Sequence, residues 1–213
     1  MNRRDFSSLG LGLVGISAAP LAQSQAGPVE GTHYQRLAQP IPMASTGKVE
    51  VVEFFWYGCQ HCFALEPLVE QWLARLPPDI NFRRAPAAFT PQYEFHQRVY
   101  YALEAMGELA NVHRKLFNTI HLERKRLTND AEMVAFVTGL GLDGAKFSET
   151  MKSFGVATKA RQARQLSEAY RIDGVPALGV QGRYITSAAM AGGNERVFQV
   201  VDHLVAQVRK TLG

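Results

Sequence analysis

The stretch "VEVVEFFWYGCQHCFALEP", Val49 to Pro67, contains the main signals for the fold of this chain. Its first half is rich in Val, Phe and Trp and is bounded by glycines, which predicts a buried strand over residues 49–56. From Cys62 onward apolar residues recur at helical spacing, up to a pair of prolines. Cys59 and Cys62, the only two cysteines, therefore lie where a strand gives way to a helix.

The remainder of the chain predicts an α/β domain interrupted by helices. Residues 80–88 read as a second strand, which completes a βαβ unit. A long amphipathic helical block follows. The segment "GVPALGVQGRYITS" then predicts a hairpin around Gln181-Gly182, and a last helix begins near Asn194. The expected division is residues 27–90 and 171–213 for the α/β domain and residues 91–170 for an inserted helical subdomain.

Residues 1–26 have the layout of a cleavable export signal. Arg3 and Arg4 precede a short apolar run, and the segment ends on small residues at Ala26. The apolar run is far shorter than the roughly 20 residues of a membrane-spanning helix. The arginine pair leaves both the general and the twin-arginine export routes open. We therefore expect a periplasmic protein.

The charge of the chain argues against nucleic acid as a partner. The formal net charge is +4, and the basic residues are scattered among acidic ones. A nucleic-acid-binding surface needs a clustered basic patch, which the sequence does not contain.

Two cysteines three positions apart allow three kinds of site. A zinc site needs four ligands, but there is no second cysteine pair, and the six histidines contain no closely spaced pair, so we expect no metal. A structural disulfide would close a loop of only two intervening residues and would stabilise the fold little. A redox pair fits better, because Cys59 opens a helix whose N–H groups favour its thiolate, while Cys62 lies deeper and can resolve a mixed disulfide.

Three further positions are candidates for the same site. His61 lies between the cysteines and can place a donor or a positive charge beside the Cys59 sulfur. Glu53 lies among apolar neighbours in the predicted strand, where a carboxyl group needs a partner or a role, such as proton relay for Cys62. A cis peptide at Val175-Pro176 would place an extended backbone beside the disulfide, where a substrate chain can pair with it.

With these residues the chain resembles the DsbA family of periplasmic thiol:disulfide oxidoreductases, within the thioredoxin superfamily. "VVEFFWYGCQHC" is similar to the family's strand, buried acid and active-site turn, and "GVPALGVQGRY" to its cis-proline loop and hairpin. "HYQRLAQPIP" resembles its N-terminal segment. The resemblance covers essentially the whole chain after residue 26. It implies a thioredoxin-like α/β fold with an inserted helical subdomain.

The resemblance also implies a function. The protein would give a disulfide to exported, unfolded polypeptides and be reoxidised by a DsbB-like membrane quinone reductase, with no cofactor beyond its own disulfide. By the family pattern Cys59 is the nucleophile, Cys62 the resolving thiol, His61 a thiolate stabiliser and Glu53 the buried acid. Val175, Pro176 and Gln60 are the expected substrate-binding positions.

Two positions depart from the family pattern. Gln60 stands where proline is commonest, and the residues between the cysteines tune the redox potential. Gly179 stands where a larger apolar residue is common, which predicts an altered substrate groove.

Two alternatives to a dithiol oxidase remain on the sequence. The same fold supports a disulfide isomerase or reductase, although the absence of an obvious dimerisation segment predicts a monomer and disfavours the isomerase. A peptide-binding chaperone without redox turnover would use the groove and the helical insert alone.

Overall fold

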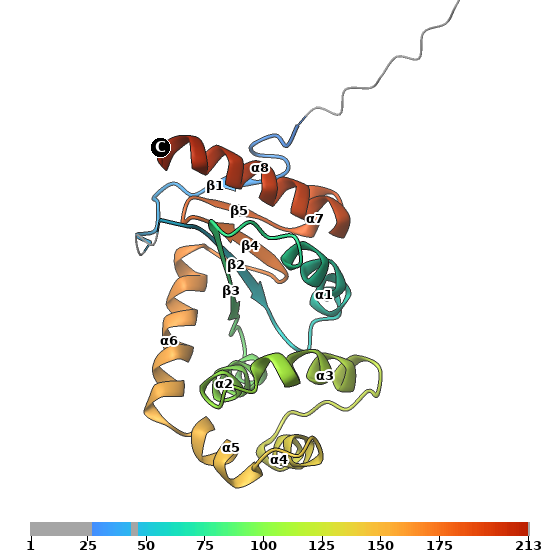
Figure 1. Ribbon diagram of the computed structural model, residues 1–213. Helices are drawn as coiled ribbons and strands as arrows, with labels where there is room; N and C mark the ends of the chain where they lie inside the picture. Colours follow the sequence, from blue (N-terminus) through green and yellow to red (C-terminus); the bar gives the residue numbers. More distant parts are fainter. Residues whose placement is uncertain (1–26, 44–46, 213) are drawn as a thin grey trace, which may run out of the picture.

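A computed structural model describes residues 27–43 and 47–212, so the predicted export signal at residues 1–26 lies outside the described residues. The first half of the chain forms a βαβ unit followed by helices (Figure 1). Its elements are β1 (Gln35–Arg36), β2 (Val49–Phe55), α1 (Gln60–Leu73), β3 (Ile80–Pro86), α2 (Pro91–Ala105) and α3 (Leu109–His121). The second half comprises α4 (Asp130–Gly139), α5 (Gly144–Met151), α6 (Phe154–Ala169), β4 (Ala177–Val180), β5 (Tyr184–Thr186), α7 (Ala188–Ala191) and α8 (Asn194–Leu212).

The five strands form one sheet in the order β1-β5-β4-β2-β3. β2 runs parallel to β3 and antiparallel to β4, so the strand that leads to the cysteines has a neighbour on each side. The register places Glu53 beside Arg84 of β3 and beside Leu178 of β4. The prediction of a buried strand before the cysteines is confirmed, and this strand is central in the sheet.

Helices cover both faces of the sheet (Figure 1). α1 and α8 pack on one face, where their apolar side chains form a core with Val49 and Val51 of β2. On the other face Val52 and Phe54 pack against Tyr170, which follows α6. Because β2 has apolar residues on both faces, the alternation of an ordinary half-exposed strand is missing from its sequence.

The helices between β3 and β4 enclose a third core, which reaches the cysteines. Phe117 of α3, Leu103 of α2 and Phe147 of α5 are fully buried there, together with Phe55 and Cys62. In the chain these helices, α2 to α6, follow β3 and precede β4, and α2 and α3 pack against the end of β2 (Figure 1). One wall of the candidate site belongs to these helices.

Side-chain caps fix the starts of three of these helices. The side chains of Asn129, Asp143 and Ser153 accept hydrogen bonds from backbone N–H groups three residues ahead, at 3.0, 2.9 and 3.3 Å. Each cap satisfies a donor that has no partner inside the helix. The predicted start of α1 at Cys62 is two residues late, because Cys59 is the N-cap and the helix begins at Gln60.

Gly179 has a packing role that the sequence did not reveal. A Cβ at this position would lie 2.3 Å from the Tyr170 ring and 2.9 Å from Val52. The glycine therefore makes room for a fully buried tyrosine, whose hydroxyl accepts a hydrogen bond from the Gly182 N–H at 2.8 Å. The expectation that Gly179 alters the substrate groove is wrong, since this position is buried in β4 and a side chain there would meet Tyr170 and Val52.

Candidate active site

The turn between β2 and α1 exposes one thiol and buries the other. Cys59 is half-buried at the N-cap of α1, whereas Cys62 is fully buried one turn further along. The Sγ of Cys59 accepts a hydrogen bond from the backbone N–H of Cys62 at 3.4 Å. Both cysteines are free thiols in this structure. An incoming thiolate can reach only the sulfur of Cys59.

The environment separates the acidities of the two thiols. Hydrogen bonds from the Cys62 side chain and from the backbone N–H groups of Cys62 and His61, together with the charge of His61, lower the pKa of Cys59 to about 6. Burial, and then the hydrogen bond to Cys59, raise the pKa of Cys62 far above its usual range. Cys59 is therefore a thiolate at neutral pH, while Cys62 keeps its proton.

The lowered pKa of Cys59 predicts how the stability of the reduced protein depends on pH. Because the folded pKa is about 6 and the usual value is 9.0, the thiolate stabilises the folded state increasingly as pH rises between them. This contribution is lost as pH falls through 6, and the disulfide form has no such thiol. Thermal unfolding of both forms should show the stability of the reduced protein rising relative to the oxidised one from about pH 6 to pH 9. A difference that stays constant over this range would contradict the assigned pKa.

The Val175-Pro176 loop lies against the exposed thiol. The Val175-Pro176 peptide is cis, and the Sγ of Cys59 lies 3.4 Å from the Val175 carbonyl oxygen, to which it donates only when it is protonated. These residues are 116 positions apart in sequence. A hollow of about 580 Å³ runs alongside, lined by His61, Val175 and Pro176 and by the start of α7. The loop, His61 and Cys59 thus share one surface, as an extended substrate segment would require.

Glu53 is buried in β2, as its apolar neighbours in the sequence predict, and it has a partner on another strand. The carboxyl group is fully buried, and its Oε2 accepts a hydrogen bond from the Nε of Arg84 at 2.9 Å. Arg84 also bonds Glu66 of α1. Burial raises the pKa of both Glu53 and Glu66 above the usual range, while the Arg84 guanidinium opposes that shift. The Arg84 guanidinium therefore forms ion pairs with two buried carboxyl groups.

The buried network continues to the helical insert. Glu66 Oε1 lies 3.3 Å from Nε2 of His113, and Nδ1 of His113 lies 2.8 Å from the Tyr57 hydroxyl. Burial, and then the charge of Arg84, lower the pKa of His113 to about 3, so this ring is neutral at physiological pH. Glu53, Arg84, Glu66, His113 and Tyr57 form a chain of polar groups under the active-site turn. Two adjacent arginines inside the apolar strand "INFRRAP" were the signal available in the sequence.

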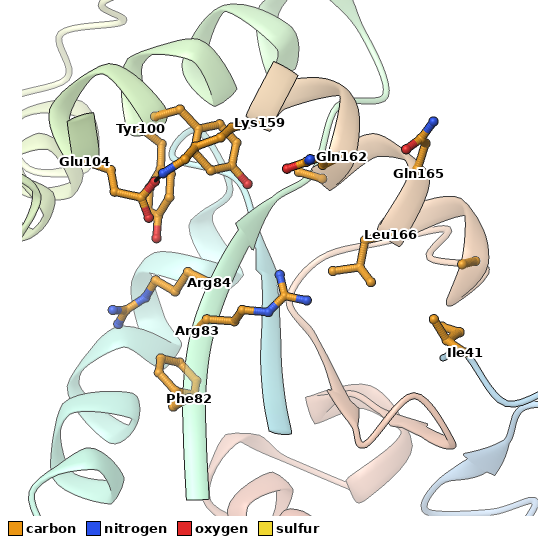
Figure 2. Close-up of a pocket in the computed structure, with 13 residues that line it drawn as sticks. Ile41, Phe82, Arg83, Arg84, Tyr100, Glu104, Lys159, Gln162, Gln165 and Leu166 are labelled. Carbon is orange, nitrogen blue, oxygen red and sulfur yellow. Dashed lines mark hydrogen bonds and ion pairs between the residues drawn. The ribbon is translucent and has the colours of Figure 1, made fainter. Parts of the chain in front are cut away.

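A larger cavity lies away from the thiols. It measures about 820 Å³ and opens between β3, α2 and α6. Figure 2 shows that the side chains of Arg83 and Arg84 leave β3 in opposite directions. Glu104 of α2 and Lys159 of α6 also line the cavity and form an ion pair with each other at 2.6 Å. Its lining includes neither cysteine nor the cis-proline loop. The volume of a cavity therefore does not identify the reactive site in this protein, because the thiols lie beside the smaller hollow.

Two other classes of site receive no support among residues 27–43 and 47–212. In these ranges no group of three or more His, Cys, Asp or Glu side chains is placed to hold a metal ion. No helix in the same part of the chain combines the length and apolar character needed to cross a membrane.

Comparisons with known proteins agree with this arrangement. The family profile of the DSBA-like thioredoxin domain matches residues 50–205. The chain is 41% identical over 179 residues to a thiol:disulfide interchange protein DsbA of Azotobacter vinelandii, covering 84% of each. It is 42% identical over 193 residues to the protein of that name from Bordetella parapertussis, covering 90% of each.

Solved structures are similar over the same extent. The crystal structure of Pseudomonas aeruginosa DsbA matches with a TM-score of 0.83 and 38% identity, over 87% of this chain and 96% of that one. The oxidoreductase DsbA from Xylella fastidiosa matches with a TM-score of 0.80 and 29% identity, over 86% of this chain and 98% of that one. Sequence and fold thus agree with these proteins over most of the chain.

Proposed function

Because the chain belongs to the DSBA-like thioredoxin domain family and is a thiol:disulfide oxidoreductase, we propose that it is a dithiol oxidase, which gives its Cys59–Cys62 disulfide to exported polypeptides. The observation that carries this proposal is the asymmetry of the two thiols. Cys59 is accessible and has a lowered pKa, whereas Cys62 is buried and has a raised one. A disulfide whose reduced form is stabilised as a thiolate is readily given away.

The exchange proceeds in two steps. A substrate thiolate attacks the Sγ of Cys59, the Cys59–Cys62 bond breaks, and its electron pair goes to the Cys62 sulfur, which takes up a proton. A second substrate thiolate then attacks the substrate sulfur of the mixed disulfide and expels Cys59 as a thiolate. The substrate is oxidised by two electrons, and the protein is left as the dithiol. A low pKa makes Cys59 a good leaving group in the second step.

The neighbouring residues have distinct roles in this proposal. His61 stabilises the Cys59 thiolate, and Glu53 is the buried acid that relays a proton to or from Cys62. Val175 and Pro176 offer extended backbone to the substrate next to the reactive sulfur, and Gln60, which is exposed between the cysteines, is a further substrate contact. The hollow beside them, with its apolar and polar lining, is where we place the substrate segment.

The cellular setting completes the proposal. We place the protein in the periplasm, exported by residues 1–26 and acting as a monomer on unfolded chains. A DsbB-like membrane quinone reductase would accept the two electrons and restore the disulfide. Residues 27–90 and 171–213 would form the thioredoxin-like domain, and residues 91–170 the inserted subdomain. The family resemblance and the likeness to proteins named DsbA support this setting.

Disulfide transfer to a small peptide tests the proposed reaction. The oxidised protein is mixed with an equimolar reduced peptide that contains two cysteines, and both partners are weighed by mass spectrometry after acid quenching. We expect the peptide to lose two hydrogens while the protein gains them. A matched peptide with one cysteine replaced by serine should stop at the mixed disulfide. If the two-cysteine peptide stays reduced, the protein is not a dithiol oxidase.

A further inference from the structure

His121, the last residue of α3, contacts residues that precede, separate and follow the two cysteines. Its Nε2 lies 2.8 Å from the carbonyl oxygen of Tyr57, and its Nδ1 lies 3.1 Å from the side-chain amide oxygen of Gln60. The ring is stacked on Phe63, with centroids 4.8 Å apart and planes 14° from parallel. One side chain of the helical insert thus holds three points of the active-site turn.

Hydrogen-bond chemistry keeps this contact intact in either protonation state of the ring. The Tyr57 carbonyl can only accept, so Nε2 carries a proton and donates to it. A neutral ring then accepts at Nδ1 from the amide NH₂ of Gln60, and a protonated ring donates to the amide oxygen. Since the amide can rotate to present either group, Gln60 stays bonded to His121. A proline at position 60 would have no group to offer.

The contact bears on the sulfur because Gln60 directly follows Cys59. The backbone N–H of Cys62 donates to the Cys59 sulfur at 3.4 Å, and the N–H of His61 faces it as well. The direction of both N–H groups depends on the backbone of Gln60, which leads into them. Anchoring the Tyr57 carbonyl and the Gln60 side chain to α3 therefore restrains the geometry of these donors.

We propose that His121 is a positioning residue for thiol exchange: it fixes the turn so that backbone N–H groups point at the Cys59 sulfur. This inference rests on the proposed reaction at Cys59. It also assigns a function to Gln60, the position at which the active-site turn departs from the commonest family pattern. The residue between the cysteines acts here through a side-chain contact with the helical insert.

A double-mutant cycle tests the proposal. The variants are His121→Phe, which keeps a ring to stack on Phe63, Gln60→Ala, and the two combined. The Cys59 titration is followed by thiolate absorbance, and the redox equilibrium is measured with glutathione. We expect His121→Phe to raise the pKa of Cys59 and to make the disulfide about fivefold less oxidising, the effect of one hydrogen bond of ordinary net strength. Gln60→Ala should act in the same direction, and the combined effect should be smaller than the sum.

Two further variants keep the outcome unambiguous. His203→Phe is the matched control, because it removes a partly buried histidine of α8 whose ring bonds Gln207 one turn along. In this variant the Cys59 pKa should equal that of the wild type. In His121→Gln the new amide can donate to the Tyr57 carbonyl, so the Cys59 pKa and the redox equilibrium should return part of the way to their wild-type values. If His121→Phe does not fold, this variant alone tests the proposal, and values no closer to wild type than those of Gln60→Ala would overturn it. The proposal would be overturned if Cys59 had its wild-type pKa in His121→Phe. It would also be overturned if the effects of His121→Phe and Gln60→Ala on the Cys59 pKa simply added in the double variant. The titration needs no substrate, so it is independent of whether the peptide is oxidised.

Discussion

Replacing Cys59 with serine abolishes disulfide transfer to the two-cysteine peptide, whereas Cys62→Ser, once glutathione is joined to Cys59 by a disulfide, forms a mixed disulfide with the one-cysteine peptide and stops there. The reason is the difference in access and acidity between the two sulfurs. Cys59 is half-buried with a pKa lowered to about 6, and Cys62 is fully buried with a raised pKa. A hydroxyl cannot replace either sulfur in an exchange of disulfides.

The same peptide assay gives the readout, with non-reducing gels to detect the mixed disulfide. In Cys62→Ser carrying glutathione on Cys59, the thiolate of the one-cysteine peptide should attack the Cys59 sulfur and expel glutathione as a thiolate, which leaves the mixed disulfide of protein and peptide. Cys59→Ser should do nothing beyond the rate of uncatalysed air oxidation. The reverse pattern, with Cys59→Ser trapping peptide, would show that Cys62 is the attacked sulfur.

Replacing Arg84 with methionine destabilises the protein by about 3–5 kcal/mol, the usual cost of leaving a buried charge without its partner. Arg84 is the cation that bonds both Glu53 and Glu66, and these carboxyl groups are only 1% and 2% exposed. Methionine fills similar space but leaves both acids in the apolar interior. Urea unfolding at neutral pH measures the loss.

Arg83→Met is the matched control, one residue away on the same strand. Arg83 bonds Glu50 at 3.0 Å, but its side chain is 39% exposed, so its loss should cost at most about 1 kcal/mol. The deficit of Arg84→Met should shrink as pH falls, because protonation removes the unpaired negative charges. Equal losses in the two variants would show that the Glu53–Arg84–Glu66 cluster is not held by charge.

The cysteine pair and the elements around it could be predicted because their signals are local. A strongly apolar run followed by helical spacing identifies β2 and α1, and the Gly174-Val175-Pro176 sequence identifies the loop that faces Cys59. The burial of Glu53 also follows from its neighbours in the strand. These conclusions need only periodicity and residue type.

The partners of these residues could not be predicted, since they depend on how distant elements meet. Arg84 is 31 positions from Glu53, and their pairing follows from the parallel register of β2 and β3. His121 reaches Gln60 across 61 positions, from a helix whose position a pattern of apolar residues does not specify. Gly179 was misread for the same reason, because its function is to accommodate Tyr170 from another segment.

The redox equilibrium of the purified protein with glutathione tests the central claim most directly. The fractions of dithiol and disulfide are measured by alkylation and mass spectrometry over a series of glutathione ratios. A dithiol oxidase should remain largely reduced at ratios that oxidise ordinary structural cysteine pairs, with a potential well above the roughly −270 mV of thioredoxin. A potential close to that of thioredoxin would contradict the account, because such a pair has little driving force to donate its disulfide and is poised to act as a reductant.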